Sequence, residues 1–208
     1  MSTRLKICGI TNWQDAVACV NLGVDLLGFN FYSASPRYIS LGDAKTIIQN
    51  IPPSTKSVAI LVRPKRIDVQ RAIVQSGVDM VQIYDPQDFS DFSEISVPVI
   101  MAKRISDTIL PDYELNGAEM ILLDTYTPGE LGGSGKVFNW SLIPKTIPRE
   151  RLILAGGITA DNVKDALEKV NPAVIDVASG AEISPGVKDL EKVTRLINSI
   201  KGREDLGI

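Results

Sequence analysis

Leu5-Lys6-Ile7-Cys8-Gly9-Ile10 is the first apolar run of the chain, and it sets a pattern that later segments repeat. The glycine permits a sharp turn after the run. Residues 11–15 are mostly polar and are typical of a helix start. The run therefore predicts a strand that leads directly into a helix, which is one βα unit. Because side chains alternate along a strand, we expect Lys6 and Cys8 on one face and Ile7 on the other.

Similar apolar runs recur roughly every 20–30 residues, which is the spacing of βα units. Eight strands are predicted, at Leu5–Ile10, Asp25–Phe31, Lys56–Val62, Met80–Tyr84, Val97–Ile105, Met120–Thr125, Arg151–Gly156 and Ala173–Ser179. Their continuous hydrophobicity suits strands that are covered on both faces. The sequence therefore predicts an α/β fold, a single-domain (β/α)8 TIM barrel over residues 1–208, with an open doubly wound sheet as the alternative.

Apolar residues at helical spacing predict three of the intervening helices. The stripes are Ala16, Cys19, Val20 and Gly23; Val163, Ala166, Leu167 and Val170, with Thr159 as N-cap; and Leu190, Val193, Ile197 and Ile200. The segments 88–94 and 107–116 have weak patterns and predict only short helices.

Composition restricts the possible functions. The chain has 208 residues, a formal net charge of −3, two cysteines and no histidine. We expect no nucleic-acid partner, because the chain is not basic, and no membrane span, because no apolar run approaches ~18 residues. The absence of a signal-peptide pattern and the two cysteines favour a cytoplasmic protein with reduced thiols. Without histidine, acid–base chemistry must use carboxylates, thiols, lysines or tyrosines, and we expect no metal.

Polar residues at the carboxyl ends of barrel strands lie on the face where active sites form. Cys8 is therefore a candidate base or nucleophile, although a small buried apolar role is equally open; Cys19, on a helical stripe, is predicted to be structural. Asp124 follows an apolar strand and predicts a general acid with a raised pKa, or else a turn cap. Asp176 is predicted to pair with Lys6, or to accept a substrate hydroxyl.

Three glycine-containing segments and one arginine complete the candidate site. Gly156-Gly157 and Ser179-Gly180 follow the seventh and eighth strands, where barrels commonly bind phosphate through backbone N–H groups. Residues 132–136 lack P-loop spacing and predict a mobile active-site loop, within a connection spanning residues 126–138. Arg37 suits a substrate carboxylate, with a solvated surface arginine as the alternative.

Together these segments resemble the phosphoribosylanthranilate isomerase family of tryptophan biosynthesis, through nearly the whole chain. The resemblance is carried by Lys6-Ile7-Cys8-Gly9-Ile10-Thr11, Leu27-Gly28-Phe29-Asn30-Phe31, Ser35-Pro36-Arg37-Tyr38-Ile39, Leu122-Leu123-Asp124-Thr125, Gly132-Gly133-Ser134-Gly135, Leu154-Ala155-Gly156-Gly157-Ile158, Asp176-Val177-Ala178-Ser179-Gly180-Ala181-Glu182 and Gly186-Val187-Lys188-Asp189.

The resemblance implies an Amadori rearrangement of N-(5-phosphoribosyl)anthranilate to 1-(2-carboxyphenylamino)-1-deoxyribulose 5-phosphate, with no metal and no cofactor. It implies that Asp124 is the general acid on the ring oxygen and Cys8 the base at C2′. Arg37 would hold the anthranilate carboxylate and Asp176 would face the ribose. The glycines at 156, 157 and 180, with Ser179, would hold the phosphate. Lys6 or the substrate iminium would support the thiolate. We expect a cytoplasmic monomer or weak homodimer that takes a small phosphorylated sugar-amine.

The chain departs from the family pattern at three places. Gln82-Ile83-Tyr84-Asp85 stands where the family usually reads Gln-Leu-His-Gly, Leu61-Val62-Arg63 where it reads Phe-Val-Asn, and Met101 where lysine is common. We expect all three on the active-site face, with Arg63 and Asp85 either paired across the mouth or selecting a different amine. Two alternatives therefore stay open: a relative that isomerises another N-substituted phosphoribosylamine, and a non-catalytic phosphosugar-binding barrel.

Overall fold

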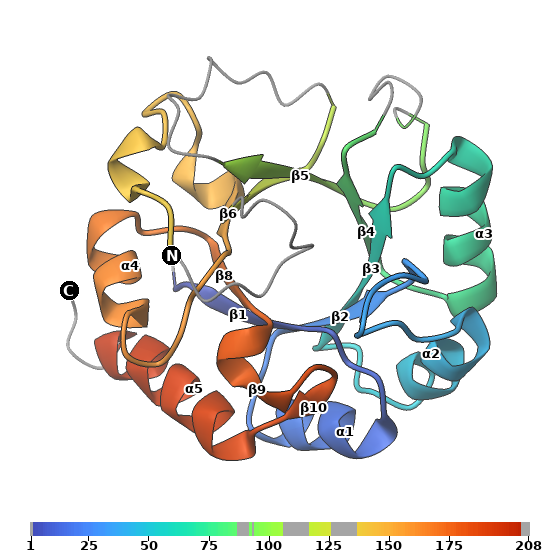
Figure 1. The fold of residues 1–208 in the computed structure, drawn as a ribbon, viewed down its shortest axis with the longest axis horizontal. Coiled ribbons are helices and arrows are strands. Elements are labelled where there is room, and N and C mark those ends of the chain that lie inside the picture. Colours follow the sequence, from blue (N-terminus) through green and yellow to red (C-terminus); the bar gives the residue numbers. More distant parts are fainter. Residues whose placement is uncertain (1, 87–91, 93, 106–116, 126–136, 205–208) are drawn as a thin grey trace.

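The computed structural model describes residues 2–86, 92, 94–105, 117–125 and 137–204. Eight parallel strands form a closed barrel in sequence order, and β1 pairs with both β2 and β8 (Figure 1). The strands are β1 (Arg4–Cys8), β2 (Leu26–Asn30), β3 (Lys56–Val62), β4 (Met80–Tyr84), β5 (Val99–Ile105), β6 (Met120–Thr125), β7 (Leu152–Leu154) and β8 (Val174–Val177). The predicted TIM barrel is confirmed, and closure of the sheet excludes the open doubly wound alternative.

Helices surround the barrel, as Figure 1 shows. They are α1 (Trp13–Asn21), α2 (Leu41–Ile48), α3 (Arg66–Ser76), α4 (Val163–Lys169) and α5 (Leu190–Glu204), with short 3-10 turns η2 (Trp140–Leu142), η3 (Arg149–Arg151) and η4 (Ser179–Ala181). A two-stranded hairpin, β9 (Glu182–Ser184) and β10 (Val187–Lys188), follows η4. The predicted short helix at 107–116 and most of the one at 88–94 lie outside the described residues.

Two details of the helix predictions are wrong. The N-cap residue of α4 is Asn162, because the Thr159 hydroxyl instead accepts a hydrogen bond from the backbone N–H of Asp161, in the turn before the helix. Leu190 is 43% exposed, because it is the first residue of α5 and precedes the first buried residue, Val193. The start of α1 follows the expected chemistry, since Asn12 Oδ1 accepts from the backbone N–H of residue 15 at 2.8 Å.

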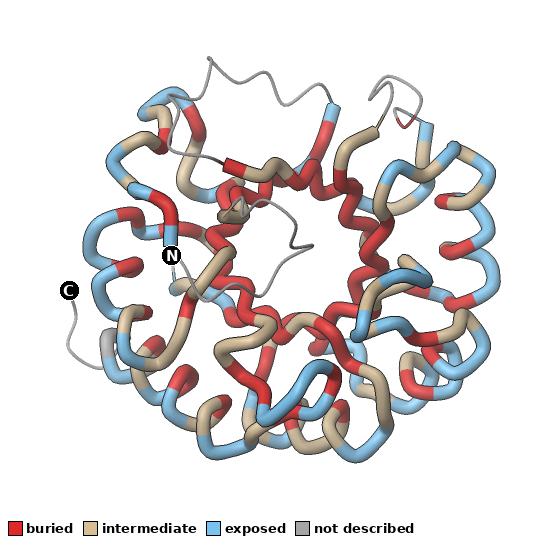
Figure 2. Tube along the Cα trace, viewed as in Figure 1, coloured by how far each residue is buried: buried red, intermediate tan, exposed pale blue. Residues whose placement is uncertain are grey.

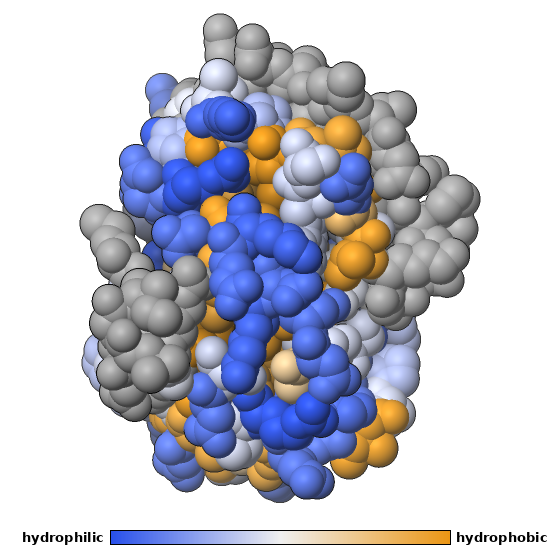
Figure 3. Space-filling view, turned by 90° about the vertical axis from the view of Figure 1, so that its left-hand side faces the viewer, coloured by the Kyte–Doolittle hydropathy of each residue, from blue (hydrophilic) through white to orange (hydrophobic). Residues whose placement is uncertain are grey.

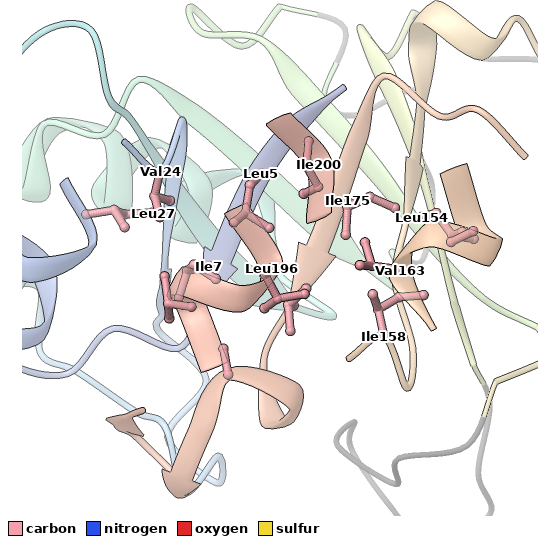
Figure 4. Close-up of a cluster of buried hydrophobic side chains, with 14 of the residues drawn as sticks. Leu5, Ile7, Val24, Leu27, Leu154, Ile158, Val163, Ile175, Leu196 and Ile200 are labelled. Atoms are coloured by element: carbon pink, nitrogen blue, oxygen red, sulfur yellow. The ribbon is translucent and has the colours of Figure 1, made fainter. Parts of the chain in front are cut away.

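Two apolar layers form the core. The barrel strands are buried on both faces (Figure 2). The barrel interior is filled by residues from alternate strand positions, among them Leu26, Val58, Ile60, Ile100, Leu122, Ile153 and Val174. The outer layer joins strands to helices, and Figure 4 shows Leu5 and Ile7 of β1 beside Leu196 and Ile200 of α5. Cys8 packs in the inner layer, so the predicted alternation of Cys8 inward and Ile7 outward is confirmed.

The face of the molecule that carries α4 and α5 is largely polar, and Figure 3 shows mostly hydrophilic side chains there. Within the described part of the chain, every helix is too short or too polar to span a bilayer.

A buried ion pair joins the first and last strands of the barrel. Lys6 and Asp176 are partners in the β1–β8 register, and Lys6 Nζ lies 3.0 Å from both carboxylate oxygens. The two side chains are 0% and 6% exposed. Burial by itself lowers the pKa of Lys6, but attraction to Asp176 and Cys8 outweighs it, so the pKa is raised. Lys6 therefore stays charged, and the predicted pairing with Asp176 is present.

Removing one partner of this pair leaves the other charge buried and uncompensated. We expect Lys6→Met to lower the free energy of unfolding by about 3–5 kcal/mol. The double variant K6M/D176L should recover most of that loss, because two apolar side chains leave no orphan charge. Urea denaturation at pH 7 measures both effects, and a loss below about 1 kcal/mol for K6M would contradict this account.

Candidate active site

One pocket opens at the carboxyl ends of the barrel strands. Its lining includes the candidate residues Cys8, Arg37, Asp124, Gly156, Gly157, Asp176, Ser179 and Gly180. Lys6 lies one layer deeper, where it pairs with Asp176. The fold thus brings together side chains and loops that are separated by more than a hundred positions in the sequence.

Cys8 ends β1 with its side chain in the pocket. Position 28, on neighbouring β2, is a glycine, and a Cβ there would lie 3.0 Å from Cys8 Sγ, so the glycine leaves room for the sulfur. Burial raises the pKa of the Cys8 thiol; Lys6, Lys188 and Arg37 oppose this shift, and Asp176 adds to it. The uncharged thiol is therefore the resting form, with cations close enough to stabilise a thiolate.

Asp124 occupies the end of β6, and the Tyr84 hydroxyl donates to its Oδ2 at 3.1 Å. Burial, followed by repulsion from Asp176, raises the pKa of Asp124 to about 6. The hydrogen bond from Tyr84, the charge of Arg104 and the backbone N–H of Thr125 act in the opposite direction. Asp124 thus releases and takes up a proton close to neutral pH, which is the property of a general acid.

The raised pKa also makes folding depend on pH. The folded state holds the Asp124 proton more tightly than the unfolded chain does. This contribution favours folding at pH 4 and is lost as the pH rises through about 6. We therefore expect Asp124→Asn, which does not titrate, to exceed the parent in stability by about 3 kcal/mol at pH 8. The difference should close near pH 4, as measured by urea denaturation at both values; an equal difference at both would contradict this linkage.

Arg37 is held by a buried ion-pair cluster that sequence reasoning missed. Its Nε and Nη2 donate to Glu182 of β9, with Nη2–Oε2 at 2.7 Å. Lys188 of β10 donates from Nζ to Glu182 Oε1 and to the Cys8 carbonyl, both at 2.6 Å. The Arg37 side chain is 12% exposed, so the alternative of a solvated surface arginine is wrong. The sequence did hold a signal for this cluster, because the opposite charges of Glu182 and Lys188 follow closely after Ser179-Gly180.

The glycine at position 9 is required by this arrangement. Its φ is +79°, and a Cβ there would lie 2.5 Å from Cδ of Arg37. Any other residue would be strained and would displace the stem of Arg37 from the pocket.

The two predicted phosphate loops pack against each other at one edge of the pocket. The loop after β7 carries Gly156 and Gly157 with φ of +82° and +67°. A Cβ at Gly156 would collide with the backbone nitrogen of Thr125. A Cβ at Gly180, in η4 after β8, would collide with the Ile158 carbonyl oxygen, so the loops approach each other at backbone distance. The predicted mobile loop at 132–136 lies outside the described residues.

The three places where the chain departs from the family pattern differ in their position relative to the pocket. Tyr84 lines the pocket, but Arg63 and Met101 do not. Met101 is 2% exposed and lies between two residues, Ile100 and Ala102, that face the barrel interior, so it faces the outer layer. The predicted Arg63–Asp85 pair is also wrong. Asp85 instead pairs with Arg104, at 2.6 Å between Oδ2 and Nη1, because β5 places that arginine beside the end of β4.

Gln82 is a further pocket residue that sequence reasoning did not single out. It is 1% exposed, lines the pocket, and its Oε1 has no hydrogen-bond partner. A buried amide oxygen without a donor is costly, so a donor from a bound molecule would complete this site.

The comparisons with known proteins agree with this geometry. Residues 5–199 match the family model described as N-(5'phosphoribosyl)anthranilate (PRA) isomerase. The N-(5'-phosphoribosyl)anthranilate isomerase of Nitrosospira multiformis is 38% identical over 99% of this chain and 100% of its own. The crystal structure of phosphoribosyl anthranilate isomerase from Thermotoga maritima is 36% identical, with a TM-score of 0.83, and covers 96% of this chain and 99% of that chain.

Another solved isomerase is described as a complex with reduced 1-(o-carboxyphenylamino)-1-deoxyribulose 5-phosphate. It is 32% identical, with a TM-score of 0.80, and covers 96% of this chain and 99% of that chain. The family match spans nearly the whole barrel and includes every strand that contributes to the pocket. The chain therefore belongs to the N-(5'-phosphoribosyl)anthranilate isomerase family.

Proposed function

We propose that this protein isomerises N-(5'-phosphoribosyl)anthranilate to 1-(2-carboxyphenylamino)-1-deoxyribulose 5-phosphate, by general acid–base catalysis. The observation that carries the proposal is that Asp124 and Cys8, an acid with a pKa near 6 and a thiol among cations, line one pocket. The glycine loops at the edge of that pocket are suited to a phosphate group. The related structure holds a reduced analogue of this product, which likewise carries a carboxyphenylamino group, a deoxyribulose chain and a phosphate.

The first step opens the furanose ring. Protonated Asp124 gives its proton to the ring oxygen while the C1′–O bond breaks. The anilino nitrogen supplies the electron pair that forms a C=N bond, so the open-chain intermediate is an iminium ion. A carboxylic acid with a pKa near 6 suits this transfer, because it is a stronger acid than water yet partly protonated near neutral pH.

The second step removes the hydrogen from C2′. Cys8 first releases its thiol proton to solvent as the iminium charge forms. The thiolate Sγ then takes the C2′ hydrogen as a proton, and the C2′–H electron pair forms the C1′=C2′ bond as the iminium nitrogen is neutralised. The resulting enol tautomerises to the C2′ ketone. Burial raises the pKa of Cys8, so the thiolate needs nearby positive charge. Lys6 and Lys188 supply it from the protein, and the iminium supplies it from the substrate.

The rest of the pocket holds the substrate. The Arg37 Nη1 is the guanidinium nitrogen that Glu182 does not engage, and it is assigned to the anthranilate carboxylate. Backbone N–H groups of residues 156–157 and 179–180 are assigned to the phosphate. Asp176 and the unpaired Gln82 oxygen are assigned to ribose hydroxyls.

Loss of either proton-transfer group should abolish most of the activity. We expect Cys8→Ala and Asp124→Asn each to lower kcat for phosphoribosylanthranilate by at least ~10²-fold. Loss of substrate fluorescence measures turnover. Cys19→Ala is the matched control, because Cys19 is buried in α1 away from the pocket, and its kcat should stay within about 2-fold of the parent.

The outcomes separate the open alternatives. An inactive parent that still binds the substrate through its phosphate would overturn the assignment. Turnover of a different N-substituted phosphoribosylamine would then indicate a divergent isomerase. Absence of any turnover, with binding that survives Cys8→Ala, would indicate a phosphosugar-binding barrel.

The phosphate assignment has its own test. Gly156→Ala combines a positive φ with a collision against the Thr125 backbone, so the loop must move. We expect its KM to rise by at least ~10-fold. Gly77→Ala is the control, because φ is also positive (+75°) but no atom lies within 4 Å of the new Cβ. A similar KM for the two variants would argue against a phosphate site at Gly156.

A further inference from the structure

We propose that Tyr84 is a positioning residue for the general acid Asp124, and that Arg104 and Asp85 hold Tyr84 in place. This inference rests on the proposed function, in which Asp124 protonates the ring oxygen. The four side chains connect β4, β5 and β6 at the mouth of the barrel.

The contact between Tyr84 and Asp124 determines which oxygen of the carboxyl carries the proton. Tyr84 is the last residue of β4 and is 8% exposed. Its hydroxyl donates a hydrogen bond to Asp124 Oδ2 at 3.1 Å. Burial, followed by repulsion from Asp124, raises the pKa of Tyr84 well above its usual value, so the phenol stays a donor. The carbonyl oxygen of a carboxylic acid is the better acceptor, so the proton resides on Oδ1.

Arg104 fixes the ring of Tyr84. Its guanidinium carbon lies 4.9 Å from the ring centroid, which is within the range of a cation–π contact. Its Nη1 is 2.6 Å from Asp85 Oδ2, and its side chain is 15% exposed. The ion pair with Asp85 therefore holds Arg104 over the face of the Tyr84 ring, and Arg104 also lines the pocket.

The backbone at Asp85 adopts a conformation that glycine tolerates better than other residues. Its φ is +47°, in the left-handed region that favours glycine and tolerates aspartate. Tyr84-Asp85 is also the dipeptide that departs from the usual His-Gly of the family. A strained aspartate persists when the surrounding structure holds it. Here the partner that holds it is the arginine that stacks on Tyr84.

The charged groups around Asp124 come from several strands. Asp176 from β8 raises its pKa, whereas Tyr84 from β4, Arg104 from β5 and the Thr125 N–H on β6 lower it. Cys8 of β1 lines the same pocket. Removing the Tyr84 hydroxyl removes a donor to the carboxylate and leaves the repulsion from Asp176. The pKa of Asp124 should therefore rise, and its carboxyl should lose its fixed orientation.

The test is Tyr84→Phe in the full-length chain. Carboxyl carbon-13 NMR of the ligand-free protein follows the titration of Asp124, with Asp124→Asn identifying its resonance. We expect the midpoint to move to higher pH by about one unit, since hydrogen bonds to charged groups are worth about that much. We also expect kcat to fall about 10-fold with KM within about 2-fold, because orientation is lost in the reacting state.

Tyr38→Phe is the matched control. Tyr38 is 47% exposed and does not line the pocket, so neither the Asp124 titration nor kcat should change. If Tyr84→Phe does not fold, Arg104→Met decides through kcat, because loss of that cation by itself raises the Asp124 midpoint. A fall in kcat with KM within about 2-fold of the parent supports the inference, and an unchanged kcat overturns it. An active parent whose Tyr84→Phe variant keeps its kcat and its Asp124 midpoint overturns this inference alone. A parent without turnover overturns the proposed function instead.

Discussion

The buried pair of Lys6 and Asp176 is the interaction on which the site depends. It links β1 to β8, the two strands whose pairing closes the barrel. A lysine enclosed by apolar strands stays charged only because a carboxylate lies 3.0 Å away. That retained charge lies directly beneath Cys8, one pleat along the same strand. The same ion pair thus joins the first and last strands of the barrel and keeps a positive charge below the thiol.

The pocket shifts the pKa of Asp124 and the pKa of Cys8 in the same direction. Burial raises the pKa of Asp124 and the pKa of Cys8 alike, because both ionise to anions and both leave water. The resting site therefore favours protonated groups. A substrate that becomes an iminium cation reverses this balance at the moment when the base is needed. In the proposed mechanism Asp124 acts before the positive charge exists and Cys8 acts after it, which suits a two-step isomerisation.

The family departures gain meaning from their neighbours in space. Tyr84 contacts Asp124, and Asp85 reaches Arg104, a residue from the next strand that the sequence pattern did not mark. Met101 was expected at the mouth, but the alternation along β5 turns it toward the outer layer. Neighbouring residues of a strand point to opposite faces, so a shift of one position moves a side chain from the pocket to the outer packing layer. Position near a strand end is therefore not enough to place a side chain in the site.

The sequence by itself determined the class of fold and most of the candidate site. Repeated apolar runs require strands buried on both faces, and the carboxyl ends of parallel strands meet on one side of a barrel. That logic brought Cys8, Asp124 and the glycine loops together. Only the tertiary structure decided the ion-pair partners: Glu182 for Arg37 and Arg104 for Asp85. Such pairs form between strands and loops that are distant in sequence, and side-chain reach and the register of the closed sheet select them.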